Sequence, residues 1–344
     1  MTSNGSALSR FLKRMSAFAG LQLVIAGFVL ALGGPVVPDH PHNAMRRKAE
    51  MLRDRSGPRV IMIGGSNVAF GVHSTLLEED LGLRTVNLAL AAGLGIELQL
   101  ACVERYGRAG DVVVVAYEYE LYTTALQDGI ASEVDSLIAQ WPEAAGLLGR
   151  TLQERVDSDG DDTLWRAHLY VQRAVAKAKK LGQQTEPDEL KRLGFNDRGD
   201  LVAHYGRPSA PKNQLGPIAE DDPSRIDRAI DRMNLFAERC RERGISVYVT
   251  FPPVPEERFA SSTPVIEKVA QRLHERLTVP ILFDPKDLVY PMDNFFDTGY
   301  HLIEEAGADR THRMATALRQ AMDRHEAQGI ETRVSGLPPE LISR

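Results

Sequence analysis

Short apolar runs alternate with longer amphipathic stretches along most of this sequence. Five of the runs have the length of buried strands, at residues 59–63, 85–90, 111–117, 247–251 and 281–283. The stretches between them carry apolar residues at helical spacing and end at glycines such as Gly82 and Gly244. Strands and helices that alternate in this way are typical of doubly wound folds. The pattern predicts an α/β domain over residues 59–324, built on a five-stranded parallel sheet.

The alternation stops between the third and fourth predicted strands. Residues 121–223 contain no strand pattern, and their apolar spacing favours helices at 133–156 and 164–181. A long segment without strands between two strands of one sheet indicates a helical insertion, which we expect to cover the edge of the sheet from which it leaves. After a last helix from about Glu304 to Asp323, residues 325–344 are predicted to be a polar tail.

The N-terminus has a different pattern. Residues 17–32 form an apolar run with one polar residue and no charge, and Arg10, Lys13 and Arg14 precede it. Such a run reaches about 24 Å as a helix, at the short end for a membrane span. Basic residues before it favour a cytoplasmic N-terminus and an exported body. We therefore predict a membrane anchor in residues 1–34 and a stalk in 35–58. A cleaved signal peptide and a buried helix of a cytosolic protein are the alternatives.

The composition of the chain argues against several classes of binding partner. The chain has 344 residues, 43% of them hydrophobic, and a formal charge of −6, which argues against nucleic acid as the main partner. Cys102 and Cys240 lie in apolar, helix-like stretches without metal-ligand spacing, so we expect two small buried side chains. The histidines are scattered, and neither a metal nor a cofactor is expected.

Two stretches carry residues for nucleophilic chemistry. Ser66 follows the first predicted strand directly after Gly64 and Gly65, and Asp297 and His301 follow the fifth. Ligands of open α/β sheets bind outside the carboxyl ends of the strands, where both stretches should emerge. A serine hydroxyl becomes a strong nucleophile when a histidine held by a carboxylate takes its proton. The sequence therefore predicts Ser66, His301 and Asp297 as a catalytic triad.

These motifs resemble the SGNH hydrolase superfamily. The matching blocks are Gly64-Gly65-Ser66-Asn67, residues 86–90 with Gly93, and Asp297 with His301. Residues 296–302 look like membrane-anchored SGNH-like proteins associated with O-acetylation of bacterial surface polysaccharides and with teichoic acid modification. The resemblance covers residues 59–120 and 245–320. It implies a flavodoxin-like three-layer sandwich and an oxyanion hole made by the N–H groups of Ser66 and Gly93 and an asparagine side chain.

The chain departs from the family pattern in two places. The family's third block is Gly-x-Asn-Asp, whereas residues 116–119 read Ala-Tyr-Glu-Tyr, with Glu118 in the block and no amide donor. The removal of one oxyanion donor typically costs about 10²–10³ in rate. The candidates for a replacement donor or pocket residue are Asn67, Tyr119 and Asn196. We place Asn196 in the oxyanion hole as a hypothesis, and a simple turn cap is its alternative.

The second departure is spacing. The acid of the family lies three positions before the histidine, whereas Asp297 lies four before His301. Asp293 or a backbone carbonyl is therefore an alternative partner for His301.

The resemblance implies an exported serine acyl-ester hydrolase or O-acyltransferase, with acetyl as the expected group and a surface polysaccharide or acylated glycan as the partner. The expected location is the inner membrane, with one span and a periplasmic domain. The alternative is a catalytically weak, glycan-binding partner of an integral-membrane acyltransferase.

Overall fold

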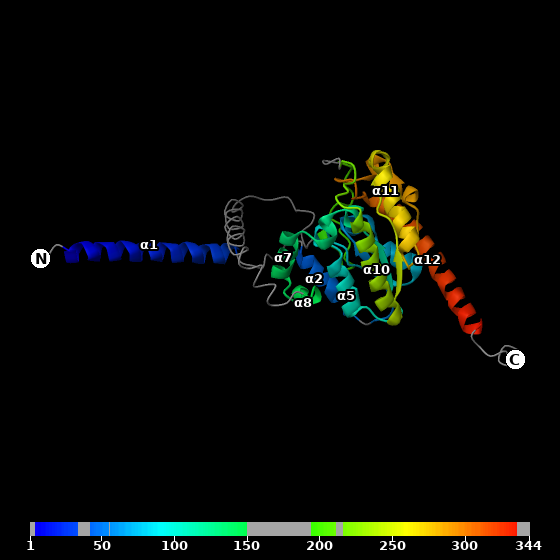
Figure 1. The fold of residues 1–344 in the computed structure, drawn as a ribbon, viewed down its shortest axis with the longest axis horizontal. Helices are drawn as coiled ribbons and strands as arrows, with labels where there is room; N and C mark the ends of the chain where they lie inside the picture. The colour runs from blue at the N-terminus through cyan, green and yellow to red at the C-terminus, as the bar shows by residue number, and fades with distance from the viewer. Residues whose placement is uncertain (1–3, 34–41, 55, 150–193, 211–215, 336–344) are drawn as a thin grey trace. The chain divides into compact units, whose positions relative to one another are not determined.

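The computed structural model describes residues 4–33, 42–54, 56–149, 194–210 and 216–335 (Figure 1). Its centre is a parallel sheet whose strands are β1 (Arg59–Gly64), β2 (Arg84–Asn87), β3 (Val112–Ala116) and β4 (Ser246–Val249). Within these ranges the sheet has four strands in the order β2-β1-β3-β4. The predicted α/β class is confirmed. Because the strand order reverses between β1 and β3, the carboxyl ends of these two strands flank a topological switch point.

The predicted fifth strand is only partly formed. Ile281 makes an isolated parallel bridge to Val249, and Leu282 N donates to Val249 O at 2.9 Å. Pro280 removes a backbone donor directly before this run, so the ladder does not extend. Beyond it, β5 (Val254–Pro255) pairs with β6 (Val289–Tyr290) in a small parallel sheet of its own.

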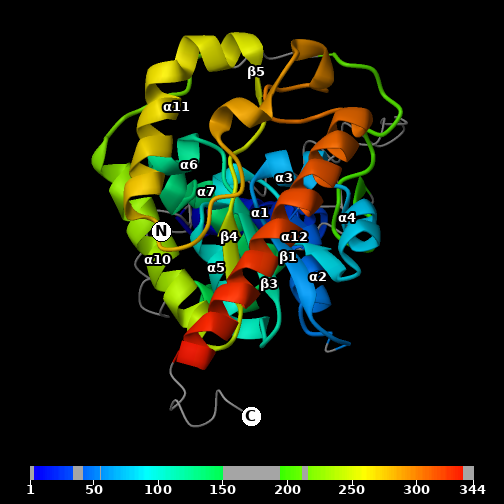
Figure 2. The same cartoon turned by 90° about the vertical axis from the view of Figure 1, so that its right-hand side faces the viewer.

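Helices cover both faces of the sheet because alternate strand residues point to opposite sides. Ile61 and Ile63 pack in one apolar cluster with α2 (His42–Met51), α5 (Glu97–Tyr106), α10 (Ser224–Glu242) and α11 (Glu256–Arg276). Val60 and Met62 pack in another with α3 (Ser66–Gly71), α4 (Ser74–Leu81) and α12 (Glu304–Ser335). Figure 2 shows α12 crossing in front of the strands, with α3 and α4 beside it. Cys102 and Cys240 are both buried and free, as expected.

The predicted stalk needs correction. Ala44, Met45 and Ala49 lie at helical spacing on α2 and are fully buried in the first cluster, and the compact unit that contains the sheet begins at Asp39. Residues 42–54 are therefore part of the domain. The C-terminus also differs, because α12 continues to Ser335 where a polar tail was predicted from residue 325.

The start of the insertion consists of short elements. They are α6 (Glu120–Thr123), η2 (Ala125–Asp128), α7 (Ala131–Gln140) and α8 (Glu143–Leu147). Up to residue 149 the helix predicted at 133–156 is divided between α7 and α8, since Pro142 cannot continue the helix that precedes it, and residues 150–156 lie outside the described residues. The helix predicted at 164–181 lies outside the described residues. The remaining short elements are η1 (Ala92–Leu94), η4 (Pro285–Leu288) and η5 (Met292–Asn294).

The N-terminal helix α1 (Asn4–Gly33) belongs to a separate unit. Its side chains from Phe11 to Ile25 are exposed. Among the helices in the described part of the chain, none combines the length and the apolar character that a membrane span requires.

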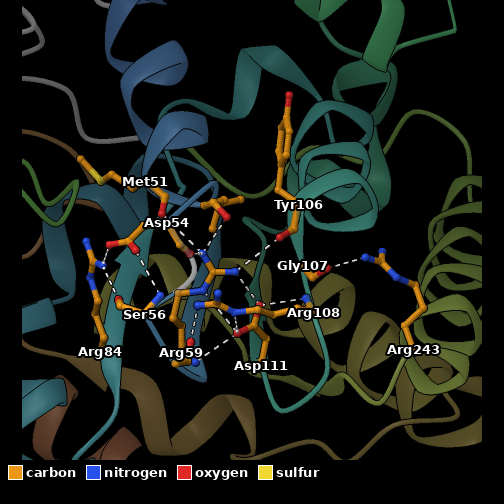
Figure 3. A network of polar contacts seen from close by, with 12 residues as sticks. Met51, Asp54, Ser56, Arg59, Arg84, Tyr106, Gly107, Arg108, Asp111 and Arg243 are labelled. Atoms are coloured by element: carbon orange, nitrogen blue, oxygen red, sulfur yellow. Dashed lines mark hydrogen bonds and ion pairs between the residues drawn. The ribbon is translucent and has the colours of Figure 1, made fainter.

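A buried ion pair lies at the amino ends of the strands, between β1 and the residue before β3 (Figure 3). Arg59 of β1 and Asp111, which precedes β3, are both almost fully buried, and Arg59 Nη2 donates to Asp111 Oδ2 at 2.7 Å. The same guanidinium donates to Leu52 O at 2.8 Å, directly after α2, and to Tyr106 O at 3.4 Å, in the last residue of α5. One side chain therefore joins two helix ends to two strands, with its donors satisfied.

We expect Asp111→Ala to lower the free energy of unfolding by about 3–5 kcal/mol, because the substitution leaves the Arg59 charge buried and unpaired. Asp54→Ala is the control, since it removes only exposed contacts, the pair with Arg84 and a hydrogen bond from Ser56 N, and should cost far less. Urea unfolding of the full chain, followed by tryptophan fluorescence, measures both values. Equal losses in the two variants would contradict this interpretation of the pair.

Candidate active site

Ser66 lies where β1 passes into α3. The strand ends at Gly64, Gly65 is the N-cap residue, and Ser66 is the first residue of the helix. Ser66 is half-buried, whereas the rest of α3 from Asn67 to Gly71 is buried. Ser66 therefore lies at the carboxyl edge of the sheet and is the one residue of α3 that is not buried.

Asn67 fixes the position of this helix start. Its backbone N–H donates to Glu118 Oε1 at 2.9 Å, and its side-chain amide donates to Ala116 O at 2.8 Å. Its backbone and side-chain oxygens accept from the Arg310 guanidinium at 2.9 Å and 3.0 Å. Burial lowers the pKa of Arg310 to about 10, so this side chain stays a cation at neutral pH. The residue after Ser66 is thus tied to the end of β3 and to α12.

Asp297 and His301 form a hydrogen-bonded pair on one loop. An antiparallel bridge between Phe295 and Leu302 closes the loop, and His301 Nδ1 lies 2.6 Å from Asp297 Oδ1. The four-residue spacing therefore still brings acid and base together, and Asp297 rather than Asp293 is the partner. Burial alone raises the pKa of Asp297, but the hydrogen bond and charge of His301 outweigh it, and this pKa lies below its ordinary value. With Nδ1 engaged, Nε2 is the nitrogen left to act as a base.

Phe70 connects the helix that carries Ser66 to the loop that carries Asp297 and His301. The His301 ring stacks on the Phe70 ring with centroids 3.7 Å apart and planes 4° from parallel. Phe70 lies four residues after Ser66 on α3, so the two side chains project from the same face of the helix. Among the described residues, neither Ser66 Oγ nor His301 Nε2 has a hydrogen-bond partner. A transfer of the Ser66 proton to His301 would require the two groups to approach to hydrogen-bond distance, and catalytic hydrogen bonds are often long in unliganded sites.

A second histidine lies beside this stack. The ring of His204 is 4.9 Å from Phe70 and 5.5 Å from Phe296, and it is almost fully buried. Burial, and then the charge of His301, lower the pKa of His204 to about 4, so it is neutral near pH 7. The segment that carries it is bound at this edge by Leu201 N, which donates to Ala69 O at 2.9 Å.

Sequence reasoning missed His204, Phe70 and Arg310. A lone histidine in a loop and an arginine on the final helix carry no recognisable signal. The four-residue spacing from Ser66 to Phe70, in contrast, was visible in the sequence.

The other predicted residues lie in different surroundings. The Asn196 amide donates to Asp200 Oδ2 at 3.0 Å within its own turn, and the structure does not bring it into contact with Ser66. The side-chain amide of Asn67 is buried and donates to Ala116 O, as described above. Tyr119 is fully buried and stacks on Phe251, with ring centroids 6.2 Å apart. Gly93 is half-buried in η1, and Glu118 packs directly behind Gly65.

The arrangement can supply a nucleophile, a general base and a group that orients the base. No group of three or more His, Cys, Asp or Glu side chains able to hold a metal ion occurs in the described ranges. No protein-family model matches the chain, and no curated protein matches it at a significant level. The interpretation of the site therefore rests on its own geometry.

Gly65 is required by the contact with Glu118. A Cβ atom at this position would overlap both carboxyl oxygens of Glu118, which is buried and held by Asn67 N–H. We expect Gly65→Ala to lower the free energy of unfolding by about 1–3 kcal/mol, since the carboxyl group moves only if that hydrogen bond breaks. Urea unfolding checks this, with Gly146→Ala as the control, because a Cβ at Gly146 in α8 meets no atom within 4 Å. Unchanged stability in Gly65→Ala would show that the contact does not constrain the turn.

Proposed function

We propose that this chain is an SGNH-type serine acyl-ester hydrolase or O-acyltransferase that acts on a cell-surface polysaccharide, with acetyl as the transferred group. One observation carries the proposal: His301 is hydrogen-bonded to Asp297 and stacked on the helix that begins with Ser66. A carboxylate, an imidazole and a hydroxyl at one sheet edge are the parts that acyl transfer through serine requires.

In the proposed reaction Ser66 Oγ attacks the acyl carbonyl carbon, and its proton passes to His301 Nε2. Asp297 stays ionised, holds the tautomer of the imidazole and stabilises its cation. The N–H groups of Ser66 and Gly93 stabilise the oxyanion. When the intermediate collapses, the leaving alkoxide takes the proton from Nε2. Water or a sugar hydroxyl then attacks the acyl-serine and gives its proton to His301 Nε2, the bond from the acyl carbon to Ser66 Oγ breaks, and Oγ takes the proton back. Attack by water is hydrolysis, and attack by the sugar hydroxyl is transfer.

The fold supports this assignment at the level of architecture. The strand order β2-β1-β3-β4 and the helices on both faces agree with the flavodoxin-like three-layer sandwich that the resemblance implies. The anchored location is a proposal from residues 17–32 and the basic residues before them. The apolar side chains of α1, such as Leu23 and Val24, are exposed and support it. We place the domain in the periplasm, with one span in the inner membrane.

The second candidate function is a glycan-binding partner of an integral-membrane acyltransferase. The lack of a side-chain amide that could bind an oxyanion, among the candidate residues that the structure describes, favours it. The amides of Asn67 and Asn196 donate to other groups, and Glu118 occupies the sequence position of the family's asparagine. Retention of polysaccharide binding without ester turnover would support this second function.

We expect Ser66→Ala to abolish labelling by a fluorophosphonate probe and to lower hydrolysis of a chromogenic acetyl ester by about 10³-fold or more, because the nucleophile is lost. Ser261→Ala on the exposed side of α11 is the matched control and should behave as the wild-type chain. Both assays use the full chain. Equal labelling of Ser66→Ala and wild type would remove the proposed nucleophile.

A further inference from the structure

Glu118 is a buried carboxyl group with only half of its hydrogen-bonding capacity used. It follows β3 and is 2% exposed. Its Oε1 accepts from Asn67 N at 2.9 Å, whereas its Oε2 is buried without a hydrogen-bond partner in the part of the chain that is described. An ionised carboxylate with one bare oxygen is an expensive group to bury.

This carboxyl group lies directly against the backbone before Ser66. It fills the space that a side chain at Gly65 would take. The negative charge of an acyl-transfer intermediate develops beside Ser66 N–H, one residue further on. As an order of magnitude, Coulomb repulsion between any two like charges at about 6 Å, with an effective dielectric constant of about 20, slows such a step about 10²-fold. An ionised Glu118 therefore opposes the chemistry of this edge.

The surroundings offer Glu118 little compensation for a negative charge. The neighbouring cation Arg310 attracts a negative charge on Glu118, but its hydrogen bonds go to Asn67 and to Gly71 O. The acid Glu120 repels Glu118 and is itself bound to Arg258 and to Tyr300 Oη. Burial, reinforced by Glu120 and opposed by the hydrogen bonds to Asn67, raises the pKa of Glu118. The other titratable groups that interact with it are Tyr117, Tyr122 and Tyr300, whose pKa values burial raises, so they stay neutral.

We propose that Glu118 is a protonated, neutral carboxyl group in the working protein and serves as a positioning residue for Ser66. Through Asn67 N–H its Oε1 holds the start of α3, and its proton on Oε2 removes the charge that would oppose the oxyanion. It occupies the position where the resembling family has an amide, and it matches that amide in being uncharged. The catalytic consequence rests on the proposed function, whereas the protonation state does not. Loss of this proton, as pH rises through the pKa of Glu118, slows acyl transfer.

Infrared difference spectroscopy of the full chain tests the protonation state without reference to activity. We expect the carbonyl band of a protonated carboxyl group at pH 7 in the wild type and in Glu120→Gln, and its loss in Glu118→Gln. Glu120→Gln is the matched control, because it removes a neighbouring carboxylate that is bound to Arg258. If Glu118→Gln does not fold, Glu118→Met serves in its place. Absence of a Glu118-dependent band overturns the proposal.

The pH profile of fluorophosphonate labelling tests the consequence. We expect the wild-type rate to fall on the order of 10²-fold as pH rises through the pKa of Glu118, and the rate of Glu118→Gln to stay level. Identical alkaline limbs in the two proteins contradict the positioning role. If no protein is labelled at Ser66 at any pH, the proposed function fails, and the infrared band alone decides the state of Glu118.

Discussion

The contacts of Asn67 are the constraint on which the site depends. Its backbone N–H, its side-chain amide and both of its oxygens are all bound, to Glu118, to Ala116 and to Arg310. These partners come from the end of β3 and from α12, the helix that follows the His301 loop. A short helix such as α3 has little stability of its own, so these hydrogen bonds decide where Ser66 stands.

The two ends of the sheet carry different kinds of polar group. At the amino ends, Arg59 and Asp111 form a buried, hydrogen-bonded pair that joins β1 to the residue before β3. At the carboxyl ends, Glu118 Oε2 lacks a partner in the described residues, and so do both ring nitrogens of His204. Arg108 Nε beside Asp111 and several other buried atoms also lack a hydrogen-bond partner within the described ranges, so an unsatisfied group indicates a functional site only where other geometry points to the same place.

The sequence predicted the features that depend on residues close together in the chain. The runs that became β1 and β3 are continuous and apolar because both faces of a parallel sheet are covered, and Asp297 and His301 pair within a single loop. Tertiary packing decided the rest. Residues 35–58 looked like a stalk because the burial of α2 depends on a distant sheet, and the amide of Asn196 is held by its own turn. The stack on Phe70 joins segments far apart in the chain, which periodicity does not reveal.

We propose above all that Ser66, His301 and Asp297 act as one catalytic unit. A crystal structure of the full chain after reaction with a fluorophosphonate tests it most directly. We expect a phosphorus–oxygen bond to Ser66 Oγ, a phosphoryl oxygen bound by the N–H groups of Ser66 and Gly93, and His301 Nε2 within hydrogen-bond distance of Oγ. An unmodified Ser66, or an adduct on a different side chain, would contradict it.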